Sequence, residues 1–171
     1  MKAASYIRED FRWAHSLLEM VVQDVTPEQA DWHPPGLANP IGATYAHAVC
    51  GEDIFVQQIL QNGEPLMESS WKGRTGISEP QLSADFEWAR RVQVDLPAAR
   101  QYAQAIYAAT DEYLAALADE TLDQVLDLSA QGFEHKPVAW VLSALVISHL
   151  NNMTGEISAL KGVQGAKGYP W

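Results

Sequence analysis

The sequence lacks several features that would place it in a specialised class of protein. Cys50 is its single cysteine, so no disulfide can form within the chain, and a reducing compartment is the simplest fit. The longest apolar stretch, 138–147, is too short and too broken to span a bilayer. The charged N-terminus also lacks the apolar run of a signal peptide. We therefore expect a cytoplasmic protein with no membrane partner.

Basic residues are scarce as well. The chain has 11 Lys and Arg against 22 Asp and Glu, for a net charge of -11. Such a chain repels phosphate backbones, so we expect no nucleic-acid partner. Dinucleotide-binding, P-loop, nucleophile-elbow and HExxH motifs are all missing. None of these common catalytic or nucleotide-binding motifs therefore indicates a function for this sequence.

Helical periodicity is what the sequence does contain. Its 171 residues fit one domain, 1–171. Apolar residues at three- and four-residue steps predict one helix from Ser5 to about Val25 and a second from Ile41 to Gln61. The Pro- and Gly-rich stretch between them, 27–40, reads as a loop.

The second half of the chain continues this pattern. Residues 82–94 are predicted helical, and a fresh helix starts or kinks at 95–97 and continues to about Leu117. The stretch 119–137 reads as a short strand pair or a loop, and the last helix should run from about Pro137 to Lys161.

About twenty residues after Asn62-Gly63 show no period, which suggests a crossover, partly a lid carrying Trp71. Together these elements predict an all-α four-helix bundle with a long crossover between helices 2 and 3.

The last helix carries polar groups on its apolar stripe. His149, Met153 and Glu156 continue the row of Leu142 and Leu145, so all should lie on one face. Burying such groups is unfavourable unless each has a partner, which suggests a site. The alternative is a core histidine satisfied by Glu156 or by a backbone carbonyl.

His47 in the second helix is the natural companion of His149. Gly51 shares its face, and a glycine lets a backbone or a ligand approach closely. Two histidines that project inward from different helices can ligate a divalent metal, which usually takes three or four protein ligands. The joint placement of His47 and His149 is therefore a candidate metal site.

The other titratable residues are assigned structural roles. His15 reads as a boundary residue of the first helix, with a further metal ligand as the alternative. His33 and His135 fall in loops and are predicted to lie at the surface. Cys50, three residues after His47, reads as small core filler, with a nucleophile activated by that histidine as the alternative.

The remaining carboxylates and the tryptophans of the loops are also assigned structural roles. The carboxylates of the EDF and GED segments are expected on solvated helix faces, and the loop tryptophans are expected to pack over the bundle ends.

With these residues in view, the sequence resembles the DinB-like (DinB/YfiT) superfamily of bacterial four-helix bundles along nearly its whole length. The segments LANPIGATYAHAVCGEDIF, TPEQADWHPPG and HLNNMTGEISALKGVQGAKGYPW carry the resemblance. It implies that His47 and His149 are two of the family's three metal-binding histidines. The position of the third is Met153 here, and thioether sulfur is a poor ligand for Zn, Ni or Mn, although it suits copper(I).

The resemblance also implies a function. The family's characterised members include metal-dependent thiol transferases, isomerases and hydrolases, so we expect a small-molecule substrate or thiol. The metal would be a divalent ion, Zn, Ni or Mn. Its binding would be weakened or lost because Met153 replaces the third histidine. Its ligands would be His47, His149 and Glu156, with His15 or water as other candidates for the third place. The alternatives are a non-catalytic bundle that binds a small ligand, or a dimeric stress-response protein without metal. A homodimer is expected by analogy with other bundles of this size.

Overall fold

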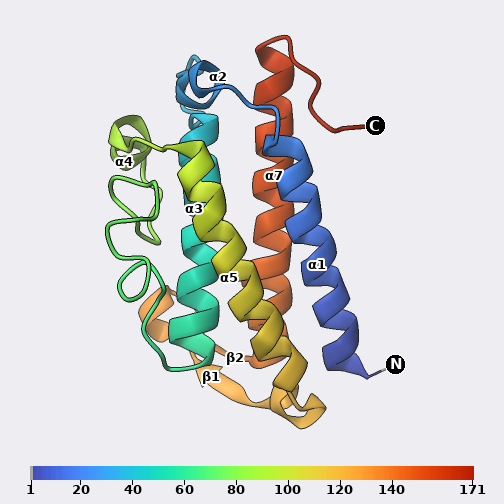
Figure 1. The fold of residues 1–171 in the computed structure, drawn as a ribbon. Helices are drawn as coiled ribbons and strands as arrows, with labels where there is room; N and C mark the ends of the chain where they lie inside the picture. Colours follow the sequence, from blue (N-terminus) through green and yellow to red (C-terminus); the bar gives the residue numbers. More distant parts are fainter. Residues whose placement is uncertain (1) are drawn as a thin grey trace.

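Four long helices form the bundle that the periodicity predicts (Figure 1). The computed structural model describes residues 2–171. In it, α1 spans Ala3–Val22, α3 spans Ile41–Asp53, α5 spans Leu96–Ala116 and α7 spans Ser148–Val163. No helix within the described part of the chain is both long and apolar enough to cross a membrane. The all-α fold class is confirmed.

Helix starts follow from capping residues. The Asp95 side chain accepts a hydrogen bond from the Ala98 N–H at 3.2 Å, and Pro97 lies in the first turn of α5. The loop predicted at 27–40 is wrong at its beginning, because α2 (Pro27–Asp31) forms there. Thr26 and Gln29 cap that helix reciprocally, with each side chain bonded to the backbone N–H of the other residue.

The helix predicted over 82–94 is also shorter than expected, because only α4 (Phe86–Arg91) is helical. Asp85 starts it by accepting from the Trp88 N–H at 2.9 Å. Beyond it the chain turns extended, and Val94 pairs with Ile77 in an isolated antiparallel bridge. The crossover therefore holds the link between α4 and α5 in an extended form, which overrides the local helical pattern.

The strand pair expected between 119 and 137 is present. Two 3₁₀ turns, Asp119–Asp123 and Ser129–Gln131, flank β1 (Val125–Asp127), which pairs antiparallel with β2 (His135–Pro137). This hairpin closes the end of the bundle at which α5 finishes and the last helix begins (Figure 1).

The two helices that carry the candidate histidines both contain π-helical turns. Ile54–Leu60 continues α3 in this form, and Val141–Ile147 joins α6 (Val138–Trp140) to α7. An α-helix has about 3.6 residues per turn, so residues spaced four apart gradually move around its surface. A π turn contains more residues, so it keeps residues spaced four apart on the same face. The buried row of the last helix accordingly runs at four-residue steps: Val138, Leu142, Val146, Leu150, Thr154.

This row corrects the stripe predicted for the last helix. His149 and Met153 lie beside the buried row and are half-buried, and Glu156 is exposed. The prediction assumed a regular α-helical turn throughout, so it placed these three residues at the centre of the core. They lie instead at the edge of the α3–α7 contact.

Candidate functional site

The two candidate histidines meet between α3 and α7. Nε2 of His47 lies 2.9 Å from Nε2 of His149, and the two rings are nearly perpendicular, with their centroids 4.6 Å apart. At this distance the two nitrogens share one proton, so one donates and the other accepts. The shared site predicted for these two residues thus has the required convergent geometry.

Small and apolar groups surround the pair. A Cβ added to Gly51 would lie 3.6 Å from Cε1 of His149 and 4.0 Å from a methyl group of Leu82. Gly51 thus lies against the His149 ring, and the crossover residue Leu82 lies close to the same glycine. Nδ1 of His47 is buried and makes no hydrogen bond of good geometry within residues 2–171. An orphaned nitrogen of this kind is uncommon, since buried polar atoms are nearly always paired.

Both imidazoles are held in the neutral form at pH 7. Burial and, to a smaller extent, the neighbouring His47 lower the pKa of His149 to about 4. Burial also lowers the pKa of His47, and the backbone of Leu82 opposes that shift. Neutral imidazole is the form that binds metals or accepts a proton, so the pair is poised for either role.

The structure brings together two of the three predicted metal ligands. Glu156 lies on the exposed side of α7, and partial burial raises its pKa. Met153, one helical turn beyond His149, packs against the edge of the core. No group of three or more His, Cys, Asp or Glu side chains within residues 2–171 is placed to hold a metal ion. The site therefore offers two nitrogen ligands and no third charged or imidazole ligand.

A second polar centre, which the sequence analysis missed, lies on the opposite side of α3. Glu52 is 1% exposed, and its carboxylate accepts from Nε2 of His15 at 2.9 Å and from Oγ1 of Thr110 at 2.7 Å. The His15 ring stacks on Tyr107 with a centroid distance of 3.8 Å. The predictions of a boundary His15 and a solvated Glu52 are both wrong, because the two groups satisfy each other inside the bundle.

Asp53 is buried too, contrary to prediction, and it anchors the crossover. Its carboxylate accepts from the backbone N–H groups of Leu66 and Met67 at 2.9 and 3.0 Å, and from the Tyr102 hydroxyl at 2.6 Å. Burial raises the pKa of Asp53, although these hydrogen bonds oppose the shift. Cys50 is fully buried as predicted, and burial raises the pKa of its thiol to about 12. It is core filler and not a nucleophile.

One signal in the sequence could have identified these buried carboxylates. Residues 41–51 are small or apolar on every side of the helix, with His47 as the exception. A helix that is apolar all round is buried, so carboxylates that continue it are buried with it.

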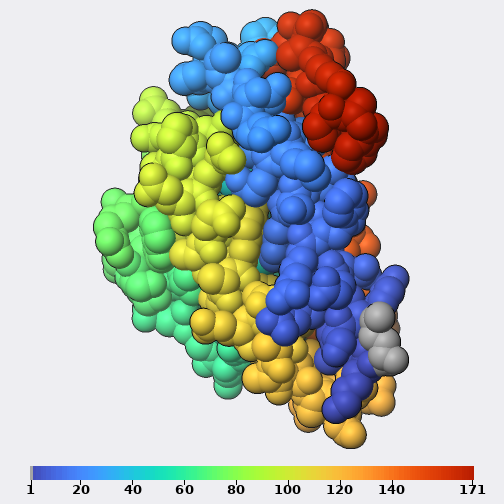
Figure 2. Space-filling model, turned by 45° about the vertical axis from the view of Figure 1, so that its right-hand side comes forward, coloured from blue at the N-terminus to red at the C-terminus, as the bar shows by residue number. Residues whose placement is uncertain are grey.

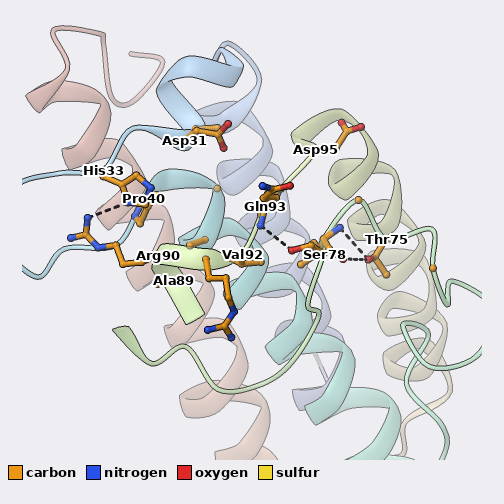
Figure 3. Close-up of a pocket in the computed structure, with 18 residues that line it drawn as sticks. Asp31, His33, Pro40, Thr75, Ser78, Ala89, Arg90, Val92, Gln93 and Asp95 are labelled. Carbon is orange, nitrogen blue, oxygen red and sulfur yellow. Dashed lines mark hydrogen bonds between the residues drawn. The ribbon is translucent and has the colours of Figure 1, made fainter. Parts of the chain in front are cut away.

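A hollow of about 880 Å³ lies elsewhere in the molecule. It opens between the end of α2, the crossover segment 73–78 and the link from α4 to α5 (Figure 3). Arg90 at its edge contacts Nδ1 of His33 at 3.1 Å and donates to the carbonyl of Gly36 at 2.9 Å. Its two terminal nitrogens thus hold the α2–α3 loop, while its buried Nε has no hydrogen-bond partner within residues 2–171. Neither His47 nor His149 lines this hollow. His33 and His135 are exposed, as predicted.

Comparison with known proteins agrees with this architecture. The crystal structure of a conserved protein from Enterococcus faecalis superposes with a TM-score of 0.80, covering 96% of this chain and 99% of that one at 22% identity. At that identity the likeness shows the fold alone. No curated protein matches the sequence. The family model for the DinB superfamily matches residues 10–157, which include both histidines of the pair. The chain therefore belongs to the DinB superfamily.

Proposed function

We propose that this protein is a transferase or hydrolase for a small molecule, with a divalent metal ion held by His47 and His149. One observation supports the proposal: two neutral imidazoles converge, with only 2.9 Å between the Nε2 atoms of His47 and His149. Metal sites in helical bundles are built from side chains on facing helices, as α3 and α7 are here.

The donor set suits a loosely held ion with open coordination positions. Two imidazole nitrogens suit Zn or Ni, and the thioether of Met153 adds nothing to a hard dication. The low pKa values of both histidines mean that few protons compete for these nitrogens at neutral pH. When bound, such an ion would lower the pKa of a thiol or water in its open position.

The surrounding residues have supporting roles in this proposal. Gly51 presents no side chain to the His149 ring, which leaves space beside it for a bound group. The free Nδ1 of His47 can donate to an acceptor group of a substrate, which would satisfy its hydrogen-bonding capacity. The carboxylate at Asp53 keeps the first turns of the crossover fixed against α3 and α5.

Metal analysis of protein purified without a histidine tag tests the proposal. We expect a stoichiometric metal in the native protein and its loss in His149→Ala. Met153→His restores a third imidazole one turn from His149 and serves as the reference for a complete site. A native protein without metal, beside a Met153→His variant that binds it, would overturn the metal-dependent function.

A second function is favoured by Met153 and by the lack of a third charged or imidazole ligand within residues 2–171. In this alternative the bundle binds a small ligand at the histidine pair without chemistry. Native protein would then be metal-free, and the imidazole NMR signals of His47 and His149 would shift on ligand addition. The same measurement on His47→Ala would show no shift of His149.

A further inference from the structure

A second hollow, of about 510 Å³, opens between α1 and α5, which lie side by side on the face shown in Figure 2. Its volume falls within the range of small-molecule sites, about 300–1,000 Å³. Aromatic and apolar side chains, uncharged polar side chains and two residues of each charge line it: Phe11, His15, Met20, Tyr107, Ala108, Ser16, Gln23, Gln104, Arg12, Arg100, Glu19 and Asp111. Neither His47 nor His149 is among them, so a ligand bound here would be independent of the proposed metal site.

His15 gives this hollow an unpartnered polar atom. Its side chain is only 9% exposed, and both of its hydrogen bonds within residues 2–171 are made by Nε2, to the two oxygens of Glu52. Tyr107 stacks on one face of the ring, and Phe11 approaches edge-on with a centroid distance of 5.7 Å. Nδ1 is therefore the one ring nitrogen without a partner, on a side chain that lines the hollow.

Arg100 contributes free donors at the same place. Its Nε donates to Oε2 of Glu19 at 2.8 Å, while the other oxygen of Glu19 accepts from the Tyr45 hydroxyl at 2.8 Å. The terminal nitrogens of Arg100 donate to no acceptor within the described part of the chain. Arg12 differs, because all three of its guanidinium nitrogens are bonded to carboxylates. A guanidinium with two free terminal nitrogens is suited to a carboxylate.

The acidic residues of the lining do not compete for such a ligand, nor do they favour a cation. Glu19 is paired with Arg100, and Asp111 is paired with Arg8 and Arg12. Each carboxylate thus already has a guanidinium beside it. The terminal nitrogens of Arg100 therefore leave the hollow with unused hydrogen-bond donors, and Nδ1 of His15 adds one further polar atom without a partner.

We propose that the hollow between α1 and α5 is a second ligand site, which binds a small organic acid. The terminal nitrogens of Arg100 bind its carboxylate. The hydrocarbon or aromatic body of the acid lies on Tyr107 and Met20, within hydrogen-bonding reach of Nδ1 of His15 for any polar substituent.

Fluorine NMR provides the test, with 4-fluorobenzoate as the probe and 4-fluorobenzyl alcohol as the neutral control of nearly equal size. We expect the benzoate resonance to broaden and shift in a saturable manner, and the alcohol to bind at least about tenfold more weakly. In Arg100→Gln the benzoate affinity should fall by a similar factor. In Ala108→Trp, which fills the hollow from its exposed rim, binding should be lost.

Arg91→Gln is the matched control. Arg91 pairs with Glu79 at 2.8 Å much as Arg100 pairs with Glu19, but it lines the 880 Å³ hollow. This variant should bind benzoate as the native protein does. Equal binding of acid and alcohol, binding unchanged in both Arg100→Gln and Ala108→Trp, or weakening in Arg91→Gln alone would each overturn the proposal. No saturable binding of the benzoate would do so as well.

Discussion

The two histidine centres of this bundle lie on two sides of the same helix, α3. They differ in whether their buried polar atoms have hydrogen-bond partners. On the α7 side of α3, His47 and His149 have only each other, and one nitrogen of His47 is left without a partner. On the α1 and α5 side, the carboxylate of Glu52 binds His15 and Thr110. The hydrogen bonding of the first centre is therefore incomplete, while the buried Glu52 carboxylate of the second centre has all its partners.

This difference indicates different roles. Removing a buried carboxylate whose hydrogen bonds are complete is costly, because its donors are then left unpaired in the interior. A pair of neutral imidazoles at the edge of the core loses little, because neither carries a charge at neutral pH. The Glu52 centre should therefore matter for folding, and the histidine pair should matter for binding.

The largest expected effect follows from removing Glu52. Glu52→Ala leaves the imidazole of His15 and the hydroxyl of Thr110 without an acceptor. Each unpaired buried group costs about 1–3 kcal/mol, and the truncated side chain leaves a cavity, so we expect a loss of about 3–5 kcal/mol in the free energy of unfolding. Urea denaturation followed by circular dichroism measures it.

Two variants give this measurement its contrast. His149→Ala should cost about 1 kcal/mol, and Glu112→Ala, at an exposed position of α5, less than about 0.5 kcal/mol. A cost for Glu52→Ala no greater than that for His149→Ala would contradict the comparison.

The sequence predicts the bundle well, because each long helix has a regular apolar face and a clear stop. The placement of His47 and His149 on the apolar faces of two helices predicts the histidine pair, and the family resemblance supports the same two residues. The sequence does not predict the exact face of α7, since π turns change the phase of the helix and leave no simple signature. Nor does it predict the partners of Glu52 and Asp53, which come from residues 37 to 58 positions away for Glu52 and 13 to 49 positions away for Asp53.

Acid should destabilise the protein through His149. The pKa of this histidine is about 4 in the folded protein, below its ordinary value, so the unfolded chain takes up its proton first as the pH falls. The stability due to neutral His149 is complete above the ordinary histidine pKa and is lost as the pH falls towards 4. Allowing for the solvent that reaches this half-buried ring, we expect a loss of about 2 kcal/mol.

This loss is measured by denaturation of EDTA-treated protein at pH 7 and pH 4.5, in the native chain and in His149→Gln. Carboxylates that titrate in the same range affect both proteins equally, so the difference between the two isolates the histidine. If the free energy of unfolding depends on pH identically in the two proteins, protonation of the His149 ring does not destabilise the fold, and the prediction is wrong.

Asp53 should affect the crossover more than the bundle. In Asp53→Asn one carboxylate oxygen becomes an NH₂ group, which cannot accept from the N–H of Leu66 or Met67. We expect a loss of about 1–2 kcal/mol and faster hydrogen exchange at whichever of the two amides is left without an acceptor. The Asp95 amide, which donates to the Gly76 carbonyl at 2.8 Å, is the internal control and should keep its protection.

The smallest effect concerns Gly51, and it bears directly on the histidine pair. A glycine within a helix costs about 0.5–1 kcal/mol relative to alanine. The added Cβ would meet His149 only at the ordinary contact distance of 3.6 Å. Gly51→Ala should therefore stabilise the fold by about 0.5 kcal/mol in thermal or urea denaturation. If it does, packing gives no reason for a glycine here, and the space beside His149 is better explained as room for a bound group. A destabilised variant would show instead that the ring itself needs that room.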